Sequence, residues 1–83
     1  MVDKKALLNR IIVDPQIMVG KPIIKGTRLT VQQVLGLLAQ GLTTNEILEE
    51  YKNLKREDII ACLLFATMTL DNTTFNPIFT NVG

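Results

Sequence analysis

The chain has 83 residues, of which 47% are hydrophobic and 20% charged, and its formal net charge is +1. A chain this short buries only about 60 to 65% of its unfolded surface, so it cannot supply two cores and we expect one domain. The hydrophobic fraction exceeds what a small interior needs, which indicates an interface, and the low net charge argues against a domain devoted to coating nucleic acid.

Side chains that carry chemistry are scarce in this sequence. Histidine and serine are absent, and Cys62 is the single cysteine. Metal sites need clustered ligands and acyl transfer needs a nucleophile beside a base, so the sequence predicts no metal, no cofactor and no enzymatic activity. One cysteine permits no internal disulfide, and its apolar neighbours Ala61 and Leu63 favour a buried, inert thiol.

The N-terminal segment predicts a short helix followed by a strand. Asp3 can cap a helix that runs through Leu8, and residues 10–13 are rich in β-branched side chains until Asp14-Pro15 ends the strand. No stretch at this end combines the basic start, the long apolar run and the cleavage site of a signal peptide. We therefore expect a cytoplasmic protein.

The next segment is punctuated by residues that favour turns. Gly20, Pro22 and Gly26 separate residues 23–24 from residues 28–31, and both of these short runs can be extended. We expect a small sheet here, packed beside the helices that follow.

The first of three longer helices is predicted from Thr30 onward. Thr30 and Gln33 have the spacing of a capping box, and Gly41 stands where a left-handed terminating residue belongs. The apolar residues follow the helical period and place one face in the core, namely Val31, Val34, Leu35 and Leu38.

The second helix is predicted from Thr43 to Tyr51, where Thr43 and Glu46 form another capping box. Its outer face is acidic, with Glu46, Glu49 and Glu50. Together with the preceding helix and the turn at Gly41, it has the outline of a helix-turn-helix.

The third helix is predicted from Arg56 to Leu70, with a weak cap because Lys55 stands where Ser, Thr or Asp is preferred. Its apolar run of about 12 residues is shorter than the roughly 20 needed to cross a bilayer, so we expect no membrane span. Apolar residues occupy every helical phase, and one small chain has too few other elements to cover them. We therefore expect a homodimer whose interface contains Ile60, Leu63, Leu64, Phe65 and Met68.

Basic residues are concentrated in the loop before the first long helix. Between residues 15 and 45 the charged residues are Lys21, Lys25 and Arg28, with no acid among them. The order Gly-Lys-Pro does not fit a phosphate loop, because proline lacks the N–H that such a loop donates. Two interpretations stay open: turns that fold a β-segment back beside the helices, or a loop that contacts nucleic-acid phosphates. Phosphates would be repelled by the acidic second helix, so DNA contacts are expected from this loop.

The C-terminal residues predict a tail outside the domain, which we place at residues 1–70. Residues 71–83 are rich in Asn and Thr and are expected to be flexible. Four large apolar residues could anchor this tail on a partner protein, namely Phe75, Ile78, Phe79 and Val82. The alternative is that they fold back onto the chain's own core or across the dimer.

A set of short motifs resembles a known prokaryotic family. They are Gly20-Lys21-Pro22, Gly26-Thr27-Arg28, Val31, Leu38, Gly41, Glu46-Ile47, Leu54 and Glu57-Asp58-Ile59. In this order they resemble the domain-of-unknown-function family 433, whose members resemble VapB-type antitoxins, and the resemblance covers roughly residues 10–70. Lys55 departs from the Ser or Thr of the family pattern, and the Asn/Thr-rich tail varies in length between members.

This resemblance implies a mainly α, homeodomain-like three-helix fold with a short N-terminal β-segment. It further implies a dimer that neutralises a PIN-like ribonuclease toxin and binds operator DNA. The sequence thus predicts an antitoxin-like binding module. The alternative is a dimeric protein-interaction domain with no role on DNA, which the low net charge and the acidic second helix favour.

Overall fold

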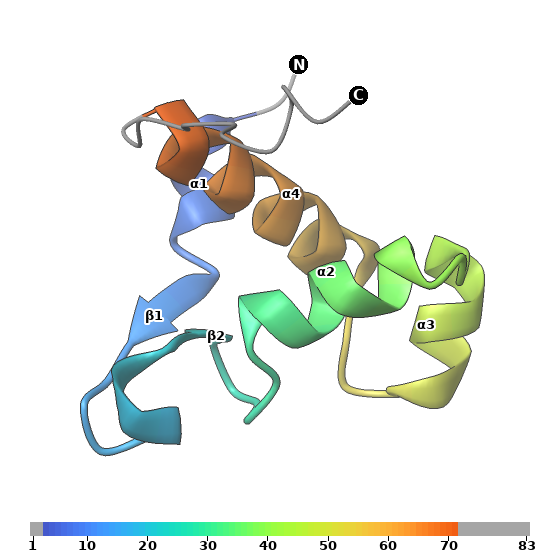
Figure 1. Ribbon diagram of the computed structural model, residues 1–83, viewed down its shortest axis with the longest axis horizontal. Helices are drawn as coiled ribbons and strands as arrows, with labels where there is room; N and C mark the ends of the chain where they lie inside the picture. Colours follow the sequence, from blue (N-terminus) through green and yellow to red (C-terminus); the bar gives the residue numbers. More distant parts are fainter. Residues whose placement is uncertain (1–2, 72–83) are drawn as a thin grey trace, which may run out of the picture.

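The computed structural model describes residues 3–71, which form four helices and a two-stranded sheet (Figure 1). The expected small, mainly helical domain with a short sheet is therefore confirmed. In chain order the elements are α1 (Lys4–Leu8), β1 (Ile11–Val13), a 3₁₀ turn (Met18–Gly20), β2 (Pro22–Ile24), α2 (Val31–Ala39), α3 (Thr44–Glu50) and α4 (Arg56–Asp71).

The sheet pairs β1 with β2 in antiparallel register, with Ile11 opposite Ile24 and Val13 opposite Pro22. Ile23 and Ile24 of β2 are buried, so the hairpin packs onto the helices as expected. The expectation that residues 28–31 are extended is wrong for Val31, which begins α2. Before it, the Leu29 carbonyl accepts from the Ile24 N–H and Thr30 forms one antiparallel bridge to Ile23. Thr30 also caps α2, and the chain turns helical directly after it.

Helices α1, α2 and α3 begin directly after the capping residues that predicted their starts. The Asp3 carboxylate accepts hydrogen bonds from two backbone N–H groups of α1. Thr30 and Gln33 form a complete capping box on α2, and Thr43 and Glu46 form a second one on α3. These bonds satisfy N–H groups that have no partner inside the helix, which sets each starting residue locally.

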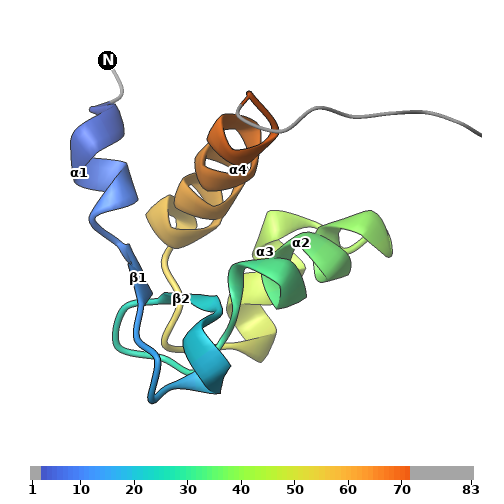
Figure 2. The ribbon, with the colours of Figure 1, turned by 60° about the vertical axis from the view of Figure 1, so that its left-hand side comes forward.

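Helix α4 lies between α1 and α2, as two views agree (Figures 1 and 2). The core forms where its inner side meets α2 and α3, with β2 packed against α2. It contains Ile24, Val31, Val34, Ile47, Leu54, Ile59 and Cys62. Cys62 is fully buried, as predicted, and burial, followed by the charge of Asp58, raises its pKa to about 12. The thiol therefore stays protonated at neutral pH.

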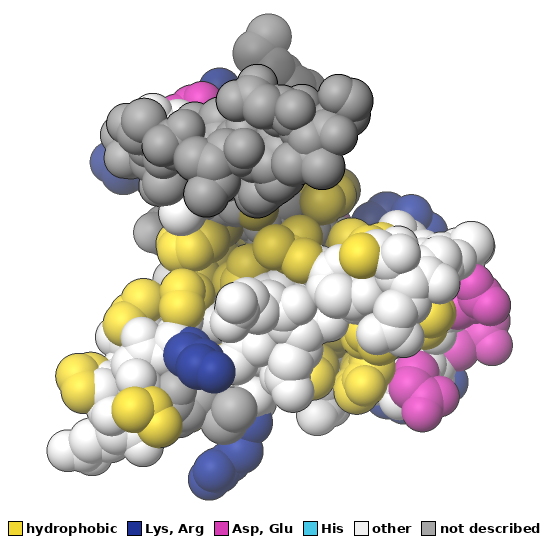
Figure 3. Space-filling view, viewed as in Figure 1, with side chains coloured by type: hydrophobic (Ala, Val, Ile, Leu, Met, Phe, Trp, Pro, Cys, Tyr) yellow, Lys and Arg dark blue, Asp and Glu magenta, His cyan; other side chains and the backbone are white. Residues whose placement is uncertain are grey.

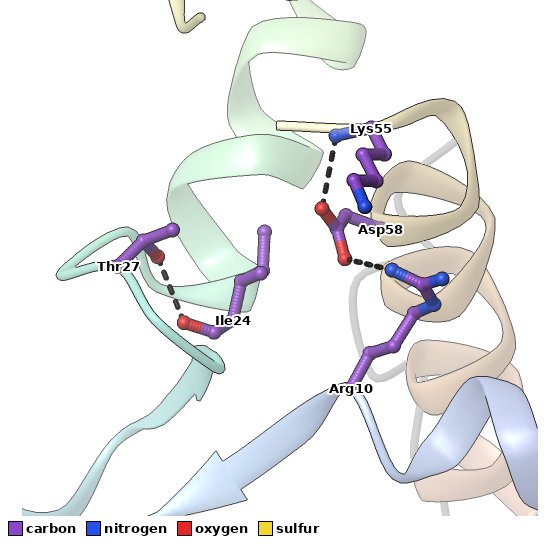
Figure 4. Close-up of polar contacts among 5 residues, drawn as sticks. All are labelled: Arg10, Ile24, Thr27, Lys55 and Asp58. Atoms are coloured by element: carbon purple, nitrogen blue, oxygen red, sulfur yellow. Dashed lines mark hydrogen bonds and ion pairs between the residues drawn. The ribbon is translucent and has the colours of Figure 1, made fainter. Parts of the chain in front are cut away.

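Asp58, which no local sequence pattern indicated, binds the backbone at the start of α4. The backbone N–H of Lys55 donates to the Asp58 carboxylate over 2.9 Å. Arg10, at the entry to β1, donates from its guanidinium to the other oxygen of the same carboxylate over 3.0 Å (Figure 4). The buried Asp58 thus satisfies the backbone N–H of the residue before α4, as the third residue of a capping box does, and ties α4 to the N-terminal segment.

Helix length bears on the membrane prediction. Within residues 3–71, none of the helices is long and apolar enough to cross a membrane.

Candidate nucleic-acid interface

The loop of residues 20–28, called the basic loop below, is held by its own backbone. Gly26 has a φ of 84°, which an L side chain rarely adopts, and it lets the chain reverse between Ile24 and Thr27. The Thr27 hydroxyl donates to the Ile24 carbonyl over 2.8 Å (Figure 4). The same hydroxyl accepts from the Leu29 N–H over 3.0 Å. The Gly-Thr pair therefore has a structural role, which is to close the turn.

The three cations of the basic loop are exposed on this closed frame. Lys21, Lys25 and Arg28 all point into solvent, and none of them forms an ion pair with another residue in the range 3–71. The loop that turns the β-segment back therefore also carries the cationic surface. Its frame is preformed, so a phosphate contact would require ordering of the long side chains only.

The structure does not gather these three cations into one hollow. Lys21 lines an apolar groove of about 370 Å³ between α2 and α4, together with Leu35 and Phe65. Arg28 lines a different recess of about 390 Å³, which it shares with Lys52 and Glu50. Lys52 is therefore a further candidate for contact with phosphates. The sequence pattern hid it because it follows three glutamates and looked like part of a charge-balanced segment.

The acidic residues of α3 form a separate surface. In Figure 3, Asp and Glu side chains gather over α3, whereas a Lys or Arg side chain stands out over β2. Glu46, Glu49 and Glu50 are exposed. The hydrogen bonds from the backbone N–H and the hydroxyl of Thr43 lower the pKa of Glu46, which keeps this carboxylate ionised. Phosphates would be repelled from this face of α3.

The predicted dimer residues lie on different sides of α4. Ile60, Leu63 and Met68 are exposed, and Leu64 is half-buried. Phe65 is half-buried and packs against the chain's own core. Leu70, which is not among the predicted interface residues, is the most exposed leucine of the helix.

Two other expectations concern the tail and metal ligands. Phe75, Ile78, Phe79 and Val82 lie outside the described residues. Between residues 3 and 71, the structure brings together no group of three or more His, Cys, Asp or Glu side chains that could hold a metal ion.

Known proteins resemble this chain in sequence and in fold. The sequence model of a family described as "Protein of unknown function (DUF433)" matches residues 11–66, from β1 into α4. Among solved structures, the chain is similar to the crystal structure of a DUF433 member protein from Anabaena variabilis. The two share 26% sequence identity with a TM-score of 0.72, over 82% of this chain and 67% of that chain. No curated protein matches the chain.

Proposed function

This chain belongs to the DUF433 family, and from that premise we propose that it is an antitoxin-like binding module that acts as a dimer in the cytoplasm. In this proposal the basic loop contacts operator DNA, and the C-terminal tail binds a PIN-like ribonuclease. The sequence resemblance described above motivates the choice, and one observation carries the DNA contact. Three exposed cations without an acidic partner among residues 3–71 project from a loop that hydrogen bonds hold in place.

The arrangement of α2 and α3 supports contacts through the loop rather than through a recognition helix. These helices are joined by a turn at Gly41, where φ is 100°, which is the connection that a homeodomain-like helix-turn-helix would need. The second helix of such a pair normally enters the major groove, but here it is α3, with its exposed glutamates. We therefore assign phosphate contacts to Lys21, Lys25 and Arg28, with Lys52 beside Arg28.

Salt-dependent binding to a duplex from the region upstream of its own gene tests this assignment. Each phosphate contact releases condensed counterions, so the affinity falls as salt rises. Replacing Lys25 or Arg28 with glutamine should weaken binding to all sequences alike and flatten the logarithmic salt slope by about one for each phosphate that is no longer neutralised. Fluorescence anisotropy at several salt concentrations measures both quantities.

Lys4→Gln is the matched control, because Lys4 is exposed on α1 and its replacement removes the same charge. It should leave the salt slope unchanged. An equal decrease in affinity for Lys4→Gln would mean that only net charge matters. Loop variants with unchanged affinity and slope, beside loss of binding on substitution in α3, would contradict the assigned surface.

A second candidate function is a dimeric protein-interaction domain with no role on DNA. The acidic face of α3 and the separation of Lys21 from Arg28 favour it, since neither feature suits a continuous phosphate track. Absence of salt-dependent DNA binding by the wild-type protein would select this alternative.

The proposed toxin contact has its own test. A chain that ends at Asp71 keeps every described residue of α4 and should remain folded and dimeric by circular dichroism and sedimentation. It should lose neutralisation of a cognate ribonuclease, measured as RNA cleavage in a mixture of the two proteins, because the tail anchors would be missing. Full neutralisation by the shortened chain would exclude the tail. Loss of stability or of the dimer would instead support the alternative in which the tail folds back.

A further inference from the structure

Four residues of α4 form an uncharged line along its outer side. Ile60, Leu63, Thr67 and Leu70 are all exposed, and they are separated by three, four and three positions. This spacing repeats with a period of 3.5 and places them on one face of the helix, as at the a and d positions of a coiled coil. No charged residue occurs between Ile59 and Leu70. The four residues are called the α4 seam below.

Among residues 3–71, the surroundings leave the seam residues exposed. At one end Ile60 lines a recess beside α1, and at the other end Leu70 lines the groove beside α2. Helix α4 lies between these two helices (Figure 2), so its free side carries the seam with a hollow on each flank. Phe65 faces the core, and Met68 lines a recess with Leu8 and Ile11. These two residues therefore lie off the seam.

The one polar residue of the seam is already satisfied within the helix. The Thr67 hydroxyl donates to the Leu63 carbonyl over 2.9 Å, and its methyl group remains to contact a neighbour. If a partner covers this hydroxyl, its hydrogen bond to the Leu63 carbonyl remains, so no polar group is left without a partner. The seam can therefore be covered by an apolar surface at little polar cost.

We propose that a second copy of this chain covers the seam, with the two α4 helices antiparallel. An uncharged line with coiled-coil spacing fits an identical line, which the same chain supplies. Ile60 of one copy would face Leu70 of the partner copy, and Leu63 would face Thr67. This arrangement specifies the interface of the dimer in the proposed function, and to that extent it rests on that proposal.

The charges at the ends of α4 determine the choice of direction. Arg56 lies one turn before Ile60 on the same line, and Asp71 directly follows Leu70. Parallel helices would bring like charges together at both ends. The Arg56 guanidinium donates to the Asn45 side chain of α3 over 2.8 Å and has further N–H groups to offer. Antiparallel helices would bring it near Asp71 on the other copy and oppose the two helix dipoles. Because four side chains per copy make a small interface, we expect reversible association at micromolar concentrations.

Sedimentation equilibrium of the full chain tests the seam in the absence of DNA. Wild-type protein should be dimeric at high micromolar concentration. Leu63→Glu should weaken association on the order of 100-fold, because each dimer would bury two unpaired carboxylates. Met68→Glu is the matched control: it adds the same charge to the same helix at a side chain of similar exposure, 41% against 48% for Leu63, and should remain dimeric. Helical circular dichroism verifies that both variants are folded.

Disulfide cross-linking tests the direction of the helices. Positions 60 and 70 are about 15 Å apart along a helix, which is too far for one disulfide. A mixture of Ile60→Cys and Leu70→Cys should therefore cross-link between the two variants, whereas each variant alone should cross-link much less. The buried Cys62 does not compete, because it is inaccessible to oxidant and to a partner thiol.

Each contrary result overturns a distinct statement. Ile60→Cys that cross-links to itself more than to Leu70→Cys overturns the antiparallel direction. A dimer that survives Leu63→Glu overturns the seam but leaves a dimer formed by another surface, such as the groove beside α2 or the tail. A wild-type chain that is monomeric at all concentrations overturns both the seam and the dimer. Binding to DNA is measured separately and is not decided by any of these results.

Discussion

Replacing Ile47 with alanine should lower the free energy of unfolding by about 2–5 kcal/mol, among the largest effects we expect from one substitution. The Ile47 side chain is 0% exposed and belongs to the core cluster that joins α3 to α2 and α4. Within the seven described residues of α3, Ile47 alone is buried. A helix this short is not stable by itself, so its attachment depends on this side chain.

Thermal and urea unfolding measure the effect at one fixed protein concentration, because self-association makes the melting temperature depend on concentration. In a domain of this size, a destabilisation of 1 kcal/mol lowers the melting temperature by about 4–8 °C. Ile47→Val is the graded control and should cost about 0.5–1.5 kcal/mol, since it removes only one methylene group. Equal stability of Ile47→Ala and wild type would mean that α3 does not depend on this contact.

Asp58→Ala should cost about 2–4 kcal/mol, because it removes two charge-assisted hydrogen bonds from a buried position. The carboxylate joins the Lys55 N–H, at the start of α4, to the Arg10 guanidinium, 48 positions earlier in the chain (Figure 4). Its removal leaves the backbone N–H of Lys55, directly before α4, without its acceptor and a partly buried cation without its partner. Urea unfolding at neutral pH measures the change.

Arg10→Met separates the two roles of Asp58. The Arg10 side chain is 35% exposed, so its ion pair is partly screened, and methionine keeps much of the apolar stem. We expect Arg10→Met to cost about 1 kcal/mol, less than Asp58→Ala, because the bond from Asp58 to Lys55 remains. A double-mutant cycle with both changes gives the coupling of the pair. Equal costs for the two single variants would show that the cap contributes nothing.

The two proposed surfaces meet only at the groove beside α2, which Lys21 and Leu70 both line. Arg28 lies apart from the seam, because it lines the recess that it shares with Lys52. A variant of Arg28 should therefore leave self-association unchanged, and the DNA measurements can be read without a change in oligomeric state. This separation makes the proposals independently testable.

The sequence by itself determined the features whose partners are close in the chain. Thr30 with Gln33 and Thr43 with Glu46 predicted the starts of α2 and α3, because each capping box lies within one helical turn. Gly41 predicted the end of α2 for a similar reason, since its backbone angle depends on the residue itself. The apolar neighbours of Cys62 predicted its burial, although the same pattern also surrounds the exposed Leu63.

Only the tertiary structure decided the features that depend on distant partners. Asp58 is a capping and ion-pairing residue because Arg10 approaches it from another element, and no local pattern contains that interaction. The apolar residues at every phase of α4 could not indicate which side faces the core; the positions of α1, α2 and α3 decided that Phe65 packs inward and left Leu63 and Leu70 exposed. Lys21 and Arg28 are near in sequence, yet the hairpin places them in different hollows. Local hydrogen bonds are encoded within one turn of chain, whereas burial and the grouping of charges depend on how whole elements pack.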